Sequence, residues 1–249
     1  MKIIIVKNYK AMSKLAADLV VRALKEKSRM VLGLPTGGTP LGLYKNLAKA
    51  CLEKKISFKK VKIFNLDEYV GLAETDSRSY HSFMKDKLFN FIDIKAENIF
   101  FPASQAKNLK QAGAKYEGLI KKHQGFDLLI LGIGLNGHIG FNEPGSDFNS
   151  KTRLVSLKAQ TRHANVKNFS KFEDVPHRAI TMGLATIMKA RKIILLAAGS
   201  KKSAIVRQAL KGKITKSVPA SILQNHKNLT VILEAGAAED LMAAKPCCG

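Results

Sequence analysis

The chain has 249 residues, 46% of them apolar, which is enough for one α/β domain with a sizeable core. No run of 18 apolar residues occurs, and the first apolar stretch is too short for a signal peptide, so we expect a cytoplasmic protein without a membrane partner. The formal net charge is +23, but Lys and Arg are spread along the chain without a basic block, and Trp is absent. This distribution argues against a dedicated nucleic-acid function.

Apolar periodicity predicts strands and helices that alternate from the amino terminus onward. In chain order these are a strand at 1–6, a helix at 11–27, a strand at 30–34, a helix at 40–53, a strand at 61–66, helices at 80–89 and 109–122, strands at 126–133 and 192–198, a helix at 202–210 and a strand at 229–233. The order predicts a doubly wound, mainly parallel sheet with helices on both faces, a Rossmann-like α/β fold.

No linker or repeat divides the chain, so we expect a single catalytic domain over 1–249. The polar segment 145–172 has few periodic apolar positions and is expected to form a mobile lid. The tail 235–249 is expected to be frayed.

A Gly-rich turn follows the predicted strand at 30–34 and stands directly before a helix. It contains Thr36, Gly37, Gly38 and Thr39. In this position backbone N–H groups and the positive end of the helix dipole face one point, which suits a phosphate group. A purely structural tight turn would explain the glycines equally well, and the flanking hydroxyls favour the phosphate.

A second turn between a strand and a helix carries Lys201 and Lys202 in the first helical turn. A cation in that place opposes the helix dipole, and a bound anion would compensate for it. One of the two lysines is therefore a candidate phosphate ligand, whereas the alternative is an ordinary surface position.

Two adjacent carboxylates, Asp67 and Glu68, end a strand that is predicted to be buried. In extended chain they point in opposite directions, so one can face the site as a general base while the other serves the structure. Burial of the base would raise its pKa toward neutrality.

The segment from Leu131 to Pro144 places four glycines around His138, with Glu143 five residues further on. Glycine is expected where the backbone must approach a ligand closely. Glu143 could hold the imidazole in one tautomer, which makes the pair a candidate acid–base centre.

The spacing of histidines and cysteines does not favour a metal site. Asp67, His138 and Glu143 could be combined as ligands, but metal ligands usually come with tighter spacing and a second His. The three cysteines, Cys51, Cys247 and Cys248, form no CxxC pair and are expected to be reduced and without a catalytic role. We therefore expect neither a metal nor another cofactor.

Four motifs in fixed order carry a family resemblance. They are Leu32-Gly33-Leu34-Pro35-Thr36-Gly37-Gly38-Thr39-Pro40, Asn65-Leu66-Asp67-Glu68-Tyr69, Gly137-His138-Ile139-Gly140-Phe141-Asn142-Glu143-Pro144 and Thr161-Arg162-His163-Ala164-Asn165. Together they resemble glucosamine-6-phosphate deaminase, and the likeness runs from about residue 1 to 234.

The resemblance implies conversion of glucosamine 6-phosphate and water into fructose 6-phosphate and ammonium, without a cofactor. By motif, Asp67 corresponds to the base of the enolisation step, His138 to the group that opens the sugar ring, and Glu143 and Asn136 to its neighbours. The residues implied to hold the phosphate are Thr36, Gly37, Gly38, Thr39, Arg162 and Lys202, so the family pattern selects Lys202 from the two lysines.

This chain departs from the resemblance at two points. Many members have Asp where this chain has Asn136, so the pH profile is expected to differ. Hexameric, allosteric members carry a basic residue at the position of Val155 and a longer aromatic tail, so we expect no activation by N-acetylglucosamine 6-phosphate and a monomer or small homo-oligomer.

The main alternative is a 6-phosphogluconolactonase-like hydrolase of related fold, which needs no enolisation base. Asp67 and Glu68, and the continuation Phe141-Asn142-Glu143, favour the deaminase. A sugar-phosphate-sensing regulator would need an appended helix-turn-helix, for which the chain has no spare length.

Overall fold

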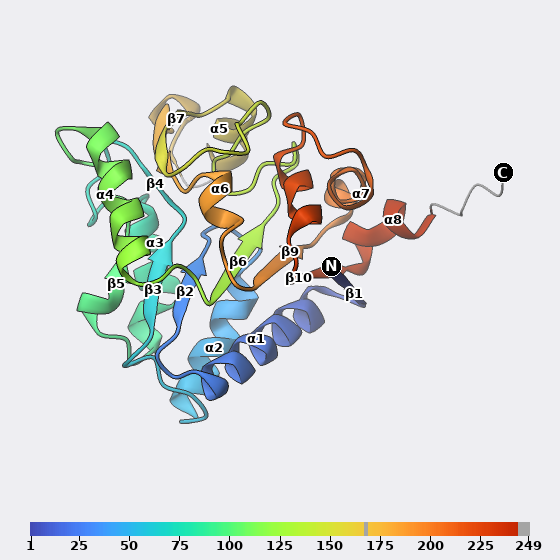
Figure 1. Ribbon diagram of the computed structural model, residues 1–249, viewed down its shortest axis with the longest axis horizontal. Coiled ribbons are helices and arrows are strands. Elements are labelled where there is room, and N and C mark those ends of the chain that lie inside the picture. The colour runs from blue at the N-terminus through green and yellow to red at the C-terminus, as the bar shows by residue number, and fades with distance from the viewer. Residues whose placement is uncertain (167–168, 244–249) are drawn as a thin grey trace.

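The computed structural model describes residues 1–166 and 169–243 and is built around a seven-stranded sheet (Figure 1). The strand order is β1-β10-β9-β6-β2-β3-β5, and every neighbouring pair is parallel. The strands are β1 (Lys2–Val6), β2 (Val31–Leu34), β3 (Lys62–Asn65), β5 (Ile99–Phe100), β6 (Leu128–Gly132), β9 (Ile193–Ala197) and β10 (Leu229–Glu234). The predicted parallel sheet is confirmed, with the short edge strand β5 added.

Two apolar layers cover the two faces of this sheet, because successive side chains of a strand point to opposite sides. In β6, Leu128 and Ile130 belong to one buried cluster, and Leu129 and Leu131 belong to the other. The first layer contains buried residues of α1 (Tyr9–Glu26), α2 (Leu41–Leu52) and α3 (Tyr80–Lys87), and the second contains those of α4 (Leu109–Lys122), α6 (Leu184–Ile187) and α7 (Ser203–Lys211). The prediction of helices on both faces is therefore confirmed.

Helix α1 shows how local sequence places these layers. The side chain of Asn8 accepts a hydrogen bond from the backbone N–H of Ala11 at 2.9 Å, which caps the first turn. Met12, Ala16 and Val20 follow at helical spacing, and all three are fully buried against the sheet. The cap and the apolar stripe together fix where the helix begins and which side faces the core.

A second, antiparallel sheet of three short strands was not predicted. It has the order β4-β8-β7 and comprises β4 (Asp67–Tyr69), β7 (Arg153–Ser156) and β8 (Arg178–Thr181). Strands of three or four residues are too short to give a period-two signal. Among its described residues, the predicted lid 145–172 contains strand β7 and helix α5 (Ala159–Asn165), and its mobility stays a prediction.

The carboxyl-terminal segment is more ordered than expected. Residues Ala235–Ala238 form a 3₁₀ turn and Glu239–Ala243 form α8. Ala237 and Ala238 are fully buried in the core. The prediction of a frayed tail is therefore wrong for 235–243, while 244–249, with Cys247 and Cys248, lie outside the described residues.

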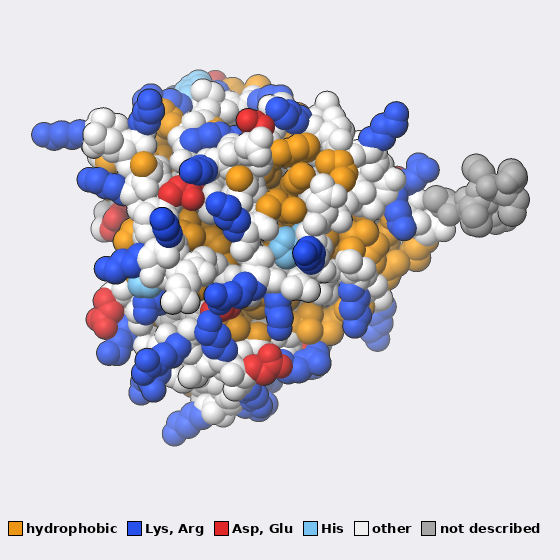
Figure 2. Space-filling view, viewed as in Figure 1, with side chains coloured by type: hydrophobic (Ala, Val, Ile, Leu, Met, Phe, Trp, Pro, Cys, Tyr) orange, Lys and Arg blue, Asp and Glu red, His pale blue; other side chains and the backbone are white. Residues whose placement is uncertain are grey.

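Charged side chains are distributed over the surface as the sequence suggested. Figure 2 shows Lys and Arg side chains across the whole visible face, with few acidic ones between them. None of the helices within 1–166 and 169–243 is long and apolar enough to cross a membrane.

Candidate active site

A cavity of about 500 Å³ opens at the carboxyl ends of β2 and β6. From β2 the chain proceeds to β3 and β5 on one side, whereas β6, β9 and β10 are added on the other side. The order of strands thus reverses between β2 and β6, and in such sheets ligands bind in the crevice outside that switch point. The predicted site residues that line the cavity are Thr36, Gly37, Gly38, Thr39, Asp67, Asn136, His138 and Lys202.

The Gly-rich turn forms one wall of the cavity. Gly37 has a φ of +95°, a conformation that residues with a Cβ rarely adopt. Among the described residues, no hydrogen bond uses the backbone N–H groups of Gly37, Gly38 or Thr39. These donors precede α2, so they are free to hold an anion at the helix amino terminus.

Tyr9 supports this turn from α1. Its hydroxyl accepts from the backbone N–H of Gly42 at 2.8 Å and lies 3.2 Å from the carbonyl oxygens of Gly38 and Thr39. The first turn of α2 and the end of the Gly-rich turn are therefore tied to α1.

The two lysines of the second turn differ in placement. Lys202 lines the cavity, and its Nζ lies 3.3 Å from the Oγ1 of Thr39, 163 residues away in the chain. Lys201 is exposed and does not line the cavity. The structure thus brings Lys202 to the Gly-rich turn, where a phosphate would meet both.

Asp67 lies at the start of β4 and is 5% exposed. Burial, and next to it the charge of Glu68, raise the pKa of its carboxyl to about 8, although a hydrogen bond from Thr181 acts in the opposite direction. A Cβ on Gly140 would lie 3.2 Å from the Oδ2 of Asp67, so the carboxyl is closely packed and has little contact with solvent. A carboxyl of this kind can take up and release a proton near neutral pH.

Glu68 points away from the cavity, as expected for the second of two adjacent residues in a strand. Its carboxylate accepts the backbone N–H groups of Tyr69 at 2.8 Å, Tyr80 at 2.9 Å and His81 at 2.9 Å. It therefore holds the first turn of α3 against β4, which is a structural role.

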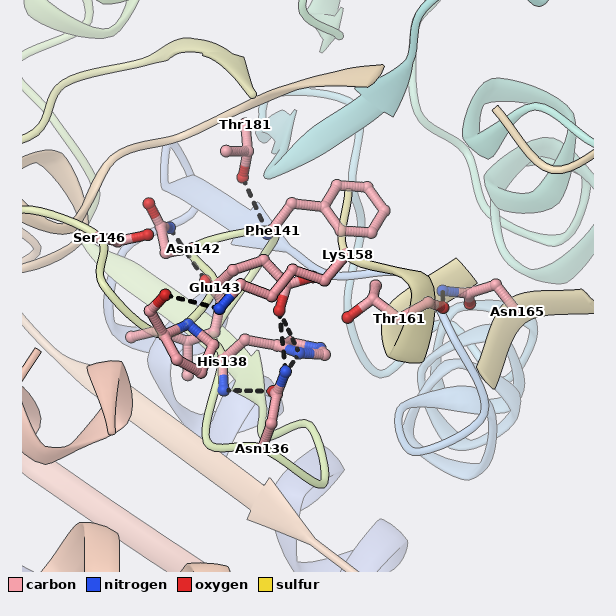
Figure 3. Close-up of polar contacts among 12 residues, drawn as sticks. Asn136, His138, Phe141, Asn142, Glu143, Ser146, Lys158, Thr161, Asn165 and Thr181 are labelled. Carbon is pink, nitrogen blue, oxygen red and sulfur yellow. Dashed lines mark hydrogen bonds and ion pairs between the residues drawn. The ribbon is translucent and has the colours of Figure 1, made fainter. Parts of the chain in front are cut away.

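His138, Asn136 and Glu143 form a hydrogen-bonded chain beside the cavity (Figure 3). The Oδ1 of Asn136 lies 2.7 Å from the Nδ1 of His138, and the Nδ2 of Asn136 donates to the Oε2 of Glu143 at 2.8 Å. Because an amide oxygen only accepts, Nδ1 is the protonated nitrogen, and Nε2 is left as an acceptor. Burial lowers the pKa of His138, the charge of Glu143 acts against it, and the charge of Lys202 lowers it further, so the environment favours the neutral ring.

Glycine is required next to this imidazole. A Cβ on Gly134 would lie 2.2 Å from the Cε1 of His138, which is far inside van der Waals contact. The glycines predicted to permit close approach of a ligand therefore also permit close approach of the histidine.

Arg162 is the one predicted phosphate residue that does not line the cavity. Its guanidinium donates to the carbonyl oxygens of Val175, at 2.9 and 3.1 Å, and of Phe172 at 3.0 Å, and stacks over the ring of Phe172. Arg162 is 6% exposed, and its helix turns Thr161 and Asn165 toward the cavity instead. Backbone carbonyls use the donors of Arg162 in this structure, and its predicted contact with the phosphate stays a prediction.

Several cavity residues were not predicted from the sequence. Tyr80 closes the wall beside the Gly-rich turn, where its hydroxyl contacts that of Tyr69 at 3.3 Å and the side chain of Thr36. The hydroxyl of Thr161 is buried and has no hydrogen-bond partner in the described part of the chain. No sequence pattern marks the hydroxyls of Tyr80 and Thr161 as site residues, although Thr161 is the first residue of the motif Thr161-Arg162-His163-Ala164-Asn165.

Within 1–166 and 169–243, no group of three or more His, Cys, Asp or Glu side chains is placed to hold a metal ion. The cavity brings the ionisable side chains of Asp67 and His138 together with the Gly-rich turn and Lys202.

A family profile described as glucosamine-6-phosphate isomerases/6-phosphogluconolactonase matches residues 7–232. The chain belongs to this family. A glucosamine-6-phosphate deaminase from Thermoanaerobacter sp. (strain X514) is 49% identical to it over 238 residues, which cover 96% of this chain and 94% of the relative.

Solved structures of the family have the same fold. A structure described as a monomeric glucosamine-6-phosphate deaminase superposes with a TM-score of 0.94 at 42% identity, covering 96% of this chain and all of that one. The 6-phosphogluconolactonase from Trypanosoma cruzi gives a TM-score of 0.75 at 22% identity, covering 96% of each chain. The second likeness concerns the fold alone.

Proposed function

We propose that this protein converts glucosamine 6-phosphate and water into fructose 6-phosphate and ammonium. The observation that carries the proposal is that two separate acid–base centres, Asp67 and His138, line one cavity that also has an anion cradle. An aldose-to-ketose conversion of a cyclic sugar needs two such centres, one for ring opening and one for proton transfer between carbons. The deaminases described above, at 42% and 49% identity, support this substrate class.

The phosphate of the substrate is held by the free N–H groups of Gly37, Gly38 and Thr39 and by the ammonium of Lys202. The dipole of α2 adds to the attraction of the dianion. This anchor fixes one end of the sugar, so that its C1 and C2 lie toward β4 and the His138 loop.

His138 then opens the pyranose ring. Its Nε2 takes the proton from the O1 hydroxyl and delivers it to O5 as the C1–O5 bond breaks, which leaves an aldehyde at C1. Asn136 keeps Nδ1 protonated, so Nε2 is the only nitrogen that exchanges protons with the cavity.

Asp67 carries the second step. Its carboxylate removes the proton from C2 while the substrate's ammonium group gives a proton to O1, so that an enol bearing a neutral amine forms at C1 and C2. Asp67 then returns its proton to C1, which leaves a protonated imine at C2. Water adds to that imine, and ammonium leaves as the ketone forms. The pKa of about 8 makes Asp67 strong enough to take a carbon-bound proton and acidic enough to give it back.

A lactonase of the same fold is the competing function. Hydrolysis of an ester does not require a base beside C2. The buried carboxyl of Asp67, with its raised pKa, would therefore have no catalytic role in a lactonase. The lactonase structures share about a fifth of their residues with this chain, and they support the fold only.

One experiment tests the proposal directly. The protein is incubated with glucosamine 6-phosphate, and ammonium and fructose 6-phosphate are measured, with 6-phosphogluconolactone as the competing substrate. We expect both products in equal amounts, unchanged by a chelator and abolished by Asp67→Asn. Hydrolysis of the lactone without release of ammonium would replace the deaminase with the alternative, and loss of activity with chelator would revive the metal hypothesis.

The remaining expectations concern assembly, regulation and location. We infer a monomer or small homo-oligomer in the cytoplasm, working in amino-sugar breakdown and not activated by N-acetylglucosamine 6-phosphate. The relative described as monomeric supports the small assembly. Analytical ultracentrifugation and a rate curve with and without the acetylated sugar test both points, and a sigmoidal curve that the acetylated sugar makes hyperbolic would contradict the second.

A further inference from the structure

A second cavity, of about 220 Å³, lies at the opposite end of the sheet from the active site. The residues that line it come from the amino ends of strands and the segments before them, and from the carboxyl ends of α1 and α4. They are Lys27, Arg29, Val31, Lys62, Lys122, His123, Gln124 and Arg191. Five of these eight side chains are Lys or Arg, and none is acidic.

A buried carboxylate holds two of the cations in place. Asp127, 8% exposed, accepts from the Nζ of Lys27 at 2.7 Å, from the guanidinium of Arg191 and from the backbone N–H of Val31 at 2.9 Å. Its pKa is lowered by these partners, although burial acts against them. Lys27 and Arg191 therefore stand at the cavity in fixed positions, and their order does not have to be created by a ligand.

The other three cations have no such partner. Arg29, Lys62 and Lys122 form no ion pair with any carboxylate in the described parts of the chain. Asp127 offsets one of the five positive charges, so four are left uncompensated around one small cavity.

The dipole of α4 explains only part of this cluster. A cation in the last turn of a helix is favourable, and Lys122 holds that position. Arg29, Lys62 and Arg191 come from segments that lead into strands, where no dipole stabilises a cation. Their convergence costs repulsion that an anion bound in the cavity would reduce.

The pKa of the His123 imidazole is sensitive to the cations around this cavity. Its ring is held at the cavity by Phe64 and Phe100, at centroid distances of 5.9 and 5.4 Å. Burial lowers its pKa, and the charges of Lys62 and Lys122 lower it further.

We propose that this cavity is a binding site for a polyphosphate chain, either inorganic or that of a nucleoside di- or triphosphate. One phosphate group carries about −1.5 to −2 charges near pH 7, so two or three linked groups match the four uncompensated cations better than one. The cavity is small and polar, so the phosphates are recognised and a nucleoside would lie outside. The site is independent of the proposed catalytic function.

Calorimetric titration of the whole protein with tripolyphosphate at low ionic strength tests the site. We expect the double variant Lys62→Gln/Lys122→Gln to weaken binding at least about tenfold. The matched control, Lys2→Gln/Lys227→Gln, removes the same charge from another cavity at this end of the sheet and should leave binding unchanged. Equal weakening by both pairs would overturn the proposal in favour of general attraction to a basic protein.

The proposed active site also attracts phosphate, so Lys202→Gln is a second control. Binding that is lost in Lys202→Gln and kept in Lys62→Gln/Lys122→Gln would refute the new site. The imidazole of His123 gives a local readout by NMR, assigned with His123→Gln. Its pKa should rise when tripolyphosphate binds, because the anion offsets the cations beside it, and an unchanged pKa at saturation would also refute the site.

Comparison of ligands separates the possible sources. Equal affinity for tripolyphosphate and ATP supports recognition of the phosphate chain alone, and tighter binding of ATP supports a nucleotide with added contacts. Equal affinity for orthophosphate would contradict the requirement for linked phosphates. Single-stranded RNA is the last ligand to compare. If it binds more tightly than tripolyphosphate, and both pairs of substitutions weaken its binding equally, the ligand is held by an extended basic surface and the proposed site is refuted.

Discussion

Replacement of the buried carboxyl by its isosteric amide, Asp67→Asn, is expected to abolish activity and to stabilise the protein. The pKa of this group is 3.8 as a free side chain and about 8 in the folded protein. Between those two values the folded state binds a proton that the unfolded state does not, so the stability of the wild type falls as the pH rises. The amide of the Asp67→Asn variant does not titrate, so the stability of the variant does not fall with pH for this reason.

The size of the effect follows from the pKa. Each pH unit above 3.8 costs about 1.4 kcal/mol of unfolding free energy, until the folded pKa is reached. Asp67→Asn should therefore gain on the order of 1 to 2 kcal/mol at pH 5 and about 4 kcal/mol at pH 7. The hydroxyl of Thr181 can donate to the amide oxygen as it does to the carboxyl, so this hydroxyl keeps its acceptor in the variant.

Urea denaturation of both proteins at pH 5, 6, 7 and 8 measures this gain. Asp127→Asn is a matched control, because its carboxyl has a lowered pKa and stabilises the folded state above its unfolded pKa. That substitution should destabilise the protein by an amount that stays nearly constant from pH 5 to 8, because the contribution of this carboxylate is lost only below its unfolded pKa of 3.8. A gain for Asp67→Asn that does not change with pH, or a net loss, would refute the argument. The same pKa predicts that kcat/KM of the wild type rises with pH up to about 8, as the base form of Asp67 accumulates.

Three further substitutions test the other parts of the site. Lys202→Gln should raise KM for the sugar phosphate about tenfold or more with a smaller change in kcat, whereas Lys201→Gln, which removes the same charge from an exposed position, should leave steady-state kinetics unchanged. Asn136→Asp places a second carboxylate at the 2.8 Å contact with Glu143, so the pKa of the neighbouring imidazole, followed by NMR, should rise above its wild-type value; an unchanged titration would show that the amide is not the link. Glu68→Ala leaves three N–H groups without their acceptor and should cost about 2 to 4 kcal/mol in thermal or urea unfolding, while Glu68→Gln, which keeps an acceptor oxygen, should cost less.

The main sheet was predictable because its central strands are buried on both faces. The continuous apolar run at Leu128 to Leu131 and the glycines that follow it fixed both a central strand and the loop of His138. The small antiparallel sheet could not be predicted in this way. Its strands β4, β7 and β8 each have only three or four residues and are held by pairing with one another. Long-range pairing of short strands leaves no local pattern in the sequence.

Much of the candidate site could be placed for the same reason. Residues that follow parallel strands meet at one edge, and the Gly-rich turn, Asp67, Asn136, His138 and Lys202 do line one cavity. Arg162 could not be placed, because the direction of a long side chain depends on acceptors from a distant segment, here Phe172 and Val175. The chemical roles of all these residues stay predictions.

The amide of Asn136 has a donor end and an acceptor end, and this gives the chain from Glu143 to His138 a direction. Its oxygen faces Nδ1 of the imidazole, and its nitrogen faces the carboxylate. A proton cannot be relayed along such a chain, because the amide holds both of its own protons and has none to pass on. In the proposed mechanism the imidazole therefore exchanges protons with the cavity through Nε2 alone and holds one transferable proton at a time.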